Sequence, residues 1–231
     1  MSKRLEKIAS YVRDGIGVAD VGTDHGYVLC MLAERGYKGN LIGTDINAAP
    51  LKKAEINLHA AGYADRAELI LCDGLDGCNA EEIDTIIVAG MGGDTITGIL
   101  DRAEWCARED ISLILQPVTK PEILRYWLTN NDYIILNDAL VDENGMLNQI
   151  IYARPGKAIK YSDAELFTGK FEYICRSEHF DKLLDIHTRR FESAVNGLAM
   201  TERTELAAWC GLLRSILREL YDMKGKHDDL C

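Results

Sequence analysis

Short apolar runs alternate with helical patterns from residue 17 onward. The runs are nearly continuous, which is typical of strands that helices cover on both faces. They occupy residues 17–21, 40–45, 67–72, 84–89 and 111–115. Between them, apolar residues recur with the helical period over 26–36, 48–62, 93–105 and 120–130. This alternation predicts parallel β-α-β units and an α/β fold with a doubly wound sheet.

The pattern changes after residue 132. Residues 133–142 and 147–154 are two strand-like runs joined by Glu143-Asn144-Gly145. Because Asn-Gly between such runs is a strong hairpin signal, we expect an antiparallel hairpin after the five parallel strands. A dinucleotide-binding sheet made of two repeated halves would more often continue with further β-α-β units.

The remainder of the chain, residues 158–231, is predicted to be helical and separate from a first domain over 1–157. One apolar stripe consists of Phe180, Leu183, Leu184, His187, Phe191, Val195 and Leu198, and a second of Leu206, Trp209, Leu212, Leu213, Ile216, Leu217 and Leu220. Between them, Thr201 and Thr204 offer N-cap side chains, and Glu205 stands early in the second helix. The stripes predict an antiparallel helical hairpin, in the manner of a coiled coil, with each stripe buried against the other.

Charge is distributed unevenly along the chain, whose net charge is −11. Residues 18–156 carry 10 basic and 22 acidic side chains, whereas residues 1–17 carry four basic and two acidic ones. The acidic balance argues against indiscriminate binding to nucleic acid. A local basic face remains available at either end from Lys3, Arg4, Lys7, Arg13, Arg189 and Arg190, although such residues are also typical of an ordinary solvated surface.

Composition indicates a cytoplasmic globular protein. Hydrophobic residues make up 47% and charged residues 27% of the 231 residues. No apolar run approaches the roughly 18 residues of a membrane span, and the N-terminus lacks the apolar core of a signal peptide. The seven cysteines include no C-x-x-C pair, which favours reduced thiols over disulfides or zinc ligands.

Acidic and glycine residues gather where four of the predicted strands end. The first strand ends in D-x-G-x-x-x-G over residues 20–26, the second at Asp45, the third at Asp73-Gly74 and the fourth at Gly90-Met91-Gly92-Gly93. Any one of these segments alone is also typical of an ordinary turn. Because the carboxyl ends of parallel strands share one edge of a sheet, together they are expected to face one ligand.

The ligand expected at this edge is not a pyrophosphate. The first turn has neither the G-x-G-x-x-G spacing nor the phosphate loop G-x-x-x-x-G-K-[ST], and its acids would repel phosphate. Asp20 can instead hold an ammonium group, Asp45 can accept from two ribose hydroxyls, and Asp73 can accept from an adenine amino group. An amino acid tail, a ribose and an adenine in this order describe S-adenosylmethionine.

The same segments resemble those of a known family. DVGTDHGY, GTDIN, LCDGLDG, VAGMGG and LILQP, followed by the helical tail, are similar to bacterial tRNA (adenine-N1)-methyltransferases that modify position 22. The resemblance covers nearly the whole chain. It implies a Rossmann-like class I methyltransferase sheet of seven strands, S-adenosylmethionine as cofactor, tRNA as substrate and no metal. One departure is Val118, which follows Gln116-Pro117 where the family often has a polar residue such as Asn.

Candidate roles follow from the strand ends and the resemblance. Asp24, His25 and Gln116 are expected to face the methyl-transfer region or to contact the target base. The residues expected to bind the cofactor are Asp20, Gly22, Thr23, Gly26, Asp45, Ile46, Asp73, Gly74, Gly90, Met91 and Gly92. Asp94, just after Gly90-Met91-Gly92-Gly93, is a further candidate for the methyl-transfer region. Asp24 and Asp94 are also compatible with helix caps, and His25 with a structural hydrogen bond. Tyr27 is expected in the core in preference to stacking on a base.

The residues after the fourth predicted strand bear on which atom is methylated. The N1 lone pair of adenine is already a nucleophile, so positioning is the main requirement. An enzyme that methylates the amino group would typically carry Asn/Asp-Pro-Pro-aromatic where this chain has Gly90-Met91-Gly92-Gly93. The sequence therefore favours a ring nitrogen.

Other functions stay open. The chain is also compatible with a methyltransferase for another RNA or a small metabolite, and with an RNA-binding module that keeps a relict cofactor site. In the favoured interpretation the helical tail binds tRNA through Lys182, Arg189 and Arg190. The protein is expected to be a monomer.

Overall fold

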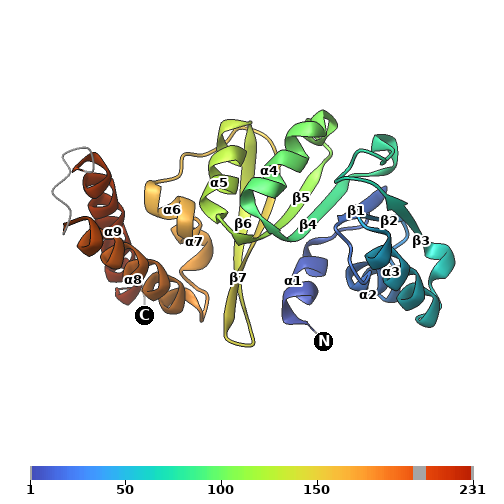
Figure 1. Cartoon of the computed structure of the whole chain (residues 1–231), viewed down its shortest axis with the longest axis horizontal. Helices are drawn as coiled ribbons and strands as arrows, with labels where there is room; N and C mark the ends of the chain where they lie inside the picture. Colours follow the sequence, from blue (N-terminus) through green and yellow to red (C-terminus); the bar gives the residue numbers. More distant parts are fainter. Residues whose placement is uncertain (1, 200–206, 230–231) are drawn as a thin grey trace.

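The computed structural model of the chain describes residues 2–199 and 207–229. Its centre is a seven-stranded sheet in the order β3-β2-β1-β4-β5-β7-β6 (Figure 1). Strand β7 runs antiparallel to both of its neighbours, β5 and β6. The strands are β1 (Gly17–Val21), β2 (Asn40–Asp45), β3 (Ala67–Leu71), β4 (Thr85–Gly92), β5 (Ser112–Thr119), β6 (Tyr133–Glu143) and β7 (Met146–Pro155). The predicted doubly wound sheet with a terminal antiparallel hairpin is confirmed.

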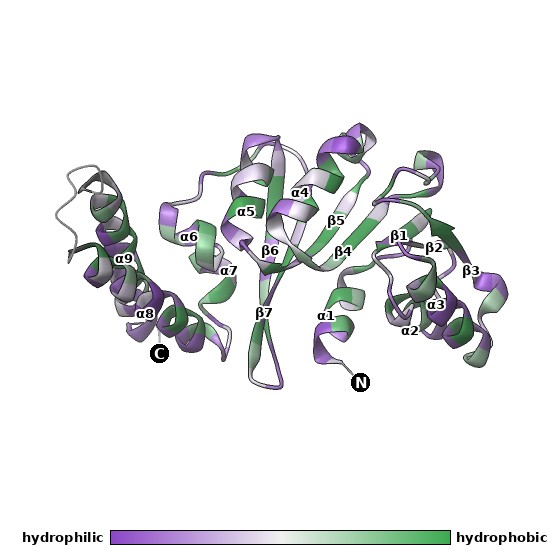
Figure 2. Ribbon diagram, viewed as in Figure 1, coloured by the Kyte–Doolittle hydropathy of each residue, from purple (hydrophilic) through white to green (hydrophobic). Residues whose placement is uncertain are grey.

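Helices cover both faces of this sheet, with α1, α2 and α3 on one face and α4 and α5 on the other. Because side chains alternate across a strand, Ile86 of β4 enters one core and Ile87 the other, which explains the nearly continuous apolar runs (Figure 2). The helices are α1 (Lys3–Tyr11), α2 (Tyr27–Glu34), α3 (Ala48–Ala60), α4 (Gly93–Arg102), α5 (Pro121–Asn130), α6 (Asp163–Thr168), α7 (Phe171–Ile174), α8 (Phe180–Ala199) and α9 (Ala207–Asp228). Three short 3-10 helices are η1 (Ala64–Arg66), η2 (Ala80–Glu82) and η3 (Glu104–Ala107).

The order of the strands determines where a ligand can bind. From β1 the chain moves outward to β2 and β3, and then returns to place β4 on the other side of β1. The strand order therefore reverses between β1 and β4. In open α/β sheets, ligands bind in the crevice outside the carboxyl ends of the strands at such a reversal.

Two glycines of α4 allow a matched test of the packing next to this edge. A Cβ atom on Gly93 would lie 2.2 Å from the carbonyl oxygen of Lys120, whereas a Cβ atom on Gly98 would meet no atom within 4 Å. We expect Gly93→Ala to lower the free energy of unfolding by about 1–3 kcal/mol, because backbone must move. We expect Gly98→Ala to raise it by about 0.5–1 kcal/mol, because alanine is the better helix former. Urea unfolding measures both changes, and effects of the same sign would contradict this packing.

The chain after residue 157 packs against the sheet before it forms its two long helices. Arg125 of α5 is fully buried and pairs with Asp138 of β6 at 2.8 Å. The Nη1 atom of Arg125 also donates to the carbonyl oxygen of Leu166 in α6 at 2.9 Å. Tyr161 packs in the same core as the central strands. Buried contacts therefore cross the predicted boundary between 157 and 158, and the division into two domains stays a prediction.

Helices α8 and α9 lie side by side at one end of the molecule (Figure 1). Phe180 and Leu220 are buried between them, as the stripes predicted. The second stripe is buried only in part, because Trp209 is 61% and Leu212 40% exposed. These two side chains line an open groove together with residues of α5 and α6 and with Phe191 of α8. The predictions for Thr201, Thr204, Glu205 and Leu206 lie outside the described residues.

The described part of the chain holds no membrane-spanning helix, no disulfide and no metal-binding cluster. None of its helices combines the length and the apolarity that crossing a bilayer requires. Its six cysteines are free thiols. Over the same residues, no three His, Cys, Asp or Glu side chains form a group that could hold a metal ion.

Candidate functional site

A pocket of about 820 Å³ lies at the carboxyl ends of β1, β2 and β4. It brings together eleven of the predicted site residues, namely Asp20, Gly22, Thr23, Asp24, His25, Asp45, Ile46, Asp73, Gly74, Gly90 and Met91. Gly26, Gly92 and Gln116 do not line it. Side chains from four separate segments thus share one crevice at the reversal of strand order.

The turn after β1 is fixed by its neighbours. The backbone N–H groups of Gly22 and Thr23 both donate to the carbonyl oxygen of Thr44 in β2, at 2.8 and 2.9 Å. Gly22 has a φ of 69°, and a Cβ atom there would lie 2.3 Å from Cε of Met91. Glycine adopts this left-handed backbone without strain, and the end of the flexible Met91 side chain packs against it.

Asp20 is buried at the end of β1, with 5% of its surface exposed. Its Oδ2 atom accepts a hydrogen bond from the Thr23 hydroxyl at 2.7 Å. Burial raises the pKa of Asp20 to about 6, although the Thr23 hydrogen bond and the charge of Arg4 act in the opposite direction. A bound cation would favour the ionised carboxylate, so this position suits an ammonium group.

Asp45 and Asp73 line the same pocket from the ends of β2 and β3. The Oδ1 atom of Asp45 accepts from the backbone N–H of Asn47 at 2.9 Å, which orients the carboxylate. Asp73 pairs with Arg102 of α4 at 2.9 Å. Both carboxylates are therefore anchored while they remain on the pocket wall.

Asp24, His25 and Tyr27 line the pocket just before and at the start of α2. The Asp24 carboxylate lies 3.6 Å from Nε2 of His25, and the rings of His25 and Tyr27 stack with centroids 5.4 Å apart. Asp24 does not cap α2, because the N-cap is Gly26 and makes no side-chain hydrogen bond. The prediction that Tyr27 lies in the core is wrong, since it is 51% exposed. As the first residue of α2, it projects from the pocket wall instead of packing on the sheet.

Asp94, a candidate helix cap, and Val118, the departure from the family pattern, both lie outside the pocket. Asp94, in the first turn of α4, pairs with Lys120 at 2.6 Å, and the N-cap of α4 is Gly92. Val118 near the end of β5 is 54% exposed and does not line the pocket. The structure gives neither residue a contact with the strand-end acids.

Gln116 is fully buried, beneath the pocket rather than on its wall. Its Oε1 atom accepts from Nη1 of Arg4 at 2.7 Å and from the backbone N–H of Gly90 at 3.1 Å. Its predicted contact with the target base stays a prediction. The structure also adds a wall that we did not predict from the sequence, formed by Ser2, Arg4, Leu5 and Glu143. The one sequence signal for this wall is the basic, amphipathic N-terminus.

Comparison with known proteins shows the class of protein that this fold and pocket define. A family model described as a methyltransferase domain matches residues 1–151. The chain therefore belongs to the methyltransferase family. A tRNA (adenine(22)-N(1))-methyltransferase of Bacillus subtilis is 30% identical over 156 residues, which span 68% of this chain and just under two thirds, 66%, of that protein.

Solved structures extend the likeness to nearly the whole chain. The B. subtilis m1A22 tRNA methyltransferase is 25% identical, with a TM-score of 0.82 over 94% of this chain and 98% of that one. Sp1610 of Streptococcus pneumoniae, solved in complex with S-adenosyl-L-methionine, is 28% identical, with a TM-score of 0.79 over 94% and 99%. The resemblance to the tRNA (m1A22) methyltransferases, predicted from the motifs, is confirmed.

Proposed function

We propose that this protein transfers the methyl group of S-adenosylmethionine to N1 of adenine 22 in tRNA. The observation that carries the proposal is the convergence of Asp20, Asp45 and Asp73 on one pocket, in a chain that aligns with a tRNA (adenine(22)-N(1))-methyltransferase. When bound, S-adenosylmethionine supplies an electrophilic methyl group.

The residues of the pocket suit the three parts of this cofactor. Asp20 would hold the ammonium group of the tail, Asp45 the two ribose hydroxyls and Asp73 the adenine amino group. Gly22, whose φ of 69° favours glycine, fits a turn whose backbone approaches a ligand closely. The remaining predicted cofactor residues on the wall are Thr23, Ile46, Gly74, Gly90 and Met91.

Asp24 and His25 are proposed to face the target adenine. N1 carries no proton, so its lone pair can attack without a general base, and the chain mainly has to position the ring. The methylated ring carries a positive charge. A carboxylate on the pocket wall, such as the exposed Asp24 beside His25, would stabilise that charge.

The affinity for S-adenosylhomocysteine is expected to fall about tenfold between pH 7 and pH 5. In the free protein the pKa of Asp20 is about 6, so at pH 5 the carboxyl is mostly protonated and must lose its proton to bind an ammonium group. Binding then releases a proton, and affinity rises with pH until Asp20 is ionised.

Calorimetry across this pH range measures the effect. Asp20→Asn should bind weakly and without this slope, whereas His25→Gln, a change elsewhere on the pocket wall, should keep the slope. A wild-type affinity that does not change between pH 5 and pH 7 would contradict the role given to Asp20.

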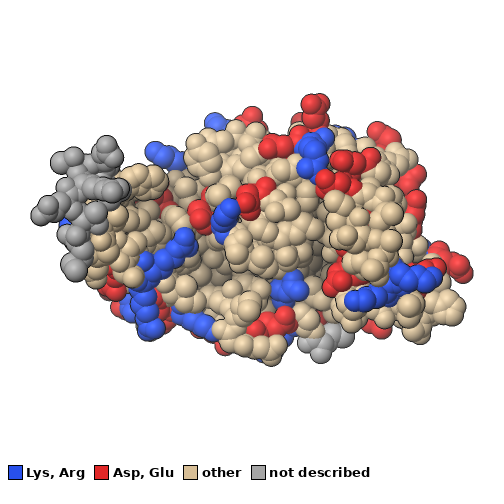
Figure 3. Space-filling view, in the orientation of Figure 1, with Lys and Arg blue, Asp and Glu red and all other residues tan. Residues whose placement is uncertain are grey.

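The arm formed by α8 and α9 is proposed to bind the tRNA backbone. Lys and Arg side chains gather across these helices (Figure 3). The Arg189 side chain is 82% exposed and therefore accessible to a phosphate. Lys182 connects the arm to the β6–β7 hairpin, because it pairs with Asp142. Phosphate contacts of this kind position folded RNA without reading its bases.

Reversing one of these charges tests the arm. Arg189→Glu is expected to raise the KM for tRNA about tenfold and to leave the affinity for S-adenosylhomocysteine unchanged. Lys52→Glu on α3, at the opposite end of the sheet, is the matched control and should change neither value. Equal KM values for the wild type and Arg189→Glu would refute this use of the arm.

Primer extension tests the position of the methyl group. A methyl on N1 blocks the pairing edge of adenine, so reverse transcriptase should stop just before residue 22 after the tRNA is incubated with the protein and S-adenosylmethionine. A transcript with guanine at position 22 should show no such stop. A stop at another position, or an equal stop in both transcripts, would contradict the proposed function.

A further inference from the structure

A second hollow, which we call the arm groove, lies where α5 and α6 meet the two helices of the arm (Figure 1). Its volume is about 310 Å³, and none of its lining residues belongs to the pocket at the strand ends. Large apolar side chains stay exposed along it, Ile123 and Tyr126 from α5 and Trp209 and Leu212 from α9. Exposed apolar surface gathered in one groove is typical of a binding site.

Two acids, Glu122 of α5 and Asp163 of α6, are the charged side chains among the described residues that line this groove. The Oε2 atom of Glu122 is buried, and no described residue donates a hydrogen bond to it. A buried carboxylate oxygen without a donor costs free energy. The groove therefore favours an occupant with N–H donors on an apolar body.

A cation lies beside the same groove. The Arg190 guanidinium lies over the rings of Phe167 and Phe191, 5.7 and 5.8 Å from their centroids. Both rings line the groove, whereas Arg190 itself is exposed and does not. The acids inside the groove would repel a phosphate, and Arg190 outside it would attract one. One place thus suits an aromatic body and a neighbouring place suits an anion, which together describe a nucleotide.

The size of the groove favours a nucleotide base over a segment of protein. A helix with its side chains is about 10–12 Å wide, and a stable protein interface buries at least about 1,000 Å². A groove of about 310 Å³ has room for one ring system instead. A basic peptide, which the two acids would also attract, would meet the like charge of Arg190.

We propose that the arm groove binds one unstacked guanine of the tRNA, with Glu122 accepting from its ring N–H and amino group and Arg190 contacting its phosphate. This inference rests on the proposed function, because it concerns the same RNA. A carboxylate only accepts hydrogen bonds, and guanine is the base whose ring N–H and amino group lie side by side on the pairing edge. Aromatic side chains such as Trp209 and Tyr126 stack on bases that single-stranded RNA exposes.

NMR of the full chain with isotope-labelled tryptophan tests the proposal without any activity measurement. Of the three tryptophans, Trp209 lines the groove, so the indole signals of Trp105 and Trp127 are internal controls. Guanosine monophosphate should shift the Trp209 signal alone, with a Kd of about 1 mM. Inosine monophosphate, which lacks the amino group, should bind about tenfold more weakly.

Two variants separate the contact with the base from the contact with the phosphate. Glu122→Gln should remove most of the preference for guanosine monophosphate over inosine monophosphate. Arg190→Gln should weaken both nucleotides equally, by about three- to tenfold, and leave the affinity for guanosine unchanged. Glu104→Gln, at an exposed position outside the groove, is the matched control and should bind all three ligands as the wild type does. Unchanged signals of Trp105 and Trp127 show that each variant is folded.

The whole tRNA provides a second test. Trp209→Ala should raise the KM for tRNA about tenfold, because a stacking platform is lost, and should leave the affinity for S-adenosylhomocysteine unchanged. Tyr221→Ala removes another exposed aromatic side chain of α9 that does not line the groove, and it should change neither value.

Three results would overturn the proposal. They are a Trp209 signal that does not move with guanosine monophosphate up to about 10 mM, equal affinity for the two nucleotides, and a wild-type KM for tRNA in Trp209→Ala. The last would assign the groove to a protein partner. Each of these leaves the proposed function intact as long as the wild type methylates tRNA. A wild type that binds the nucleotide at Trp209 but methylates no tRNA would refute the proposed function instead.

Discussion

Asp45→Ala is expected to lower the affinity for S-adenosylmethionine about 100-fold. Asp45 ends β2, is oriented by the Asn47 backbone N–H, and lies on the wall of the pocket. A carboxylate there can accept from both ribose hydroxyls, and each such charge-assisted hydrogen bond is stronger than one between neutral groups. Alanine would leave both hydroxyls without that acceptor. Calorimetric titration of the purified chain measures the change.

The matched control for this variant is Asp65→Ala. Asp65 lies in η1, is exposed and does not line the pocket, so its removal should leave the affinity unchanged. Asp45→Ala binding within about threefold of the wild type would exclude a ribose contact at this strand end. The assignment of the pocket would then need another acceptor for the sugar.

Asp138→Ala is expected to lower the free energy of unfolding by about 3–5 kcal/mol. Asp138 and Arg125 have 1% and 0% of their side chains exposed, so the variant leaves a buried guanidinium without its counter-charge. The Asp138 carboxylate also accepts from the Lys170 backbone N–H at 3.3 Å, which ties the start of α7 to β6. Loss of the carboxylate therefore weakens both the charge pair and the docking of the C-terminal region. Urea unfolding followed by circular dichroism measures the loss.

A surface ion pair provides the comparison. Asp110 pairs with Arg108 at 3.0 Å but its side chain is 51% exposed, so Asp110→Ala should cost no more than about 1 kcal/mol. The double variant Arg125→Met/Asp138→Leu should recover much of the stability, because it leaves no unpaired charge in the core. If Asp138→Ala and Asp110→Ala lowered the free energy of unfolding equally, the buried pair would not be what holds the C-terminal region on the sheet.

Local patterns in the sequence were sufficient for the sheet and for much of the pocket. Strands β1 and β2 have the predicted bounds, because their apolar runs end abruptly at glycine and acidic residues. The strand-end acids could be assigned to one edge because parallel topology forces their carboxyl ends together. Nothing beyond local pattern and topology was needed for these features.

Contacts between distant parts of the chain could not be predicted in this way. Arg4 meets Gln116 across 112 positions, and no periodicity or motif in α1 points to that meeting. Trp209 was predicted to be buried against the other helix but is exposed. An apolar stripe predicts which face of a helix is apolar, but not how much of that face the partner helix covers. Within the region 158–231 predicted to be helical, α6 and α7 were not predicted as separate helices, because elements of six and four residues are too short to show a period.

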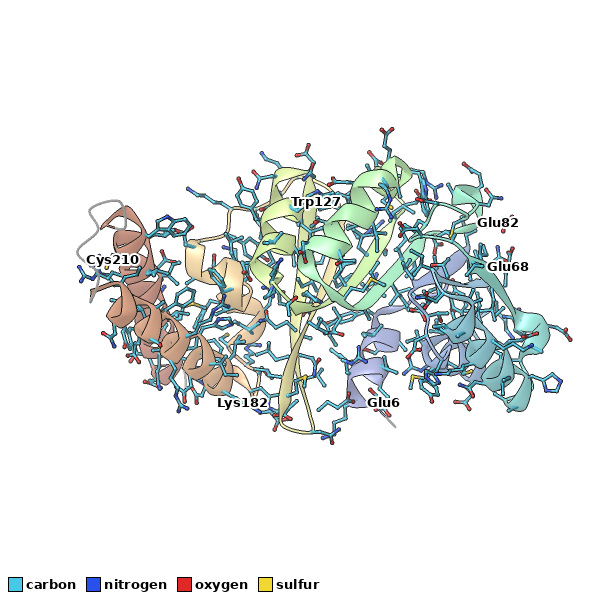
Figure 4. The ribbon with its side chains drawn as sticks, viewed as in Figure 1. Glu6, Glu68, Glu82, Trp127, Lys182 and Cys210 are labelled. Atoms are coloured by element: carbon cyan, nitrogen blue, oxygen red, sulfur yellow. The ribbon has the colours of Figure 1, made fainter. Side chains whose placement is uncertain are left out.

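The β6–β7 hairpin illustrates how such contacts join the parts of the molecule. Lys182 of α8 lies on one side of the hairpin and Glu6 of α1 on the other (Figure 4). Lys182 pairs with Asp142 near the tip, and the next residue, Glu143, holds Ser2 and Arg4. The hairpin therefore links the arm proposed to bind tRNA with the pocket wall formed by Ser2, Arg4, Leu5 and Glu143.

Mass spectrometry of nucleosides from tRNA treated with the protein and S-adenosylmethionine tests the proposed chemistry most directly. The expected product is one 1-methyladenosine per tRNA. Its yield should fall strongly in the Asp45→Ala variant and stay at the wild-type level in Asp65→Ala. Methyl transfer to N1 of adenine would be contradicted if the product were N6-methyladenosine or a methylated guanosine, cytidine or uridine. It would also be contradicted if a chain that binds the cofactor produced no methylated nucleoside.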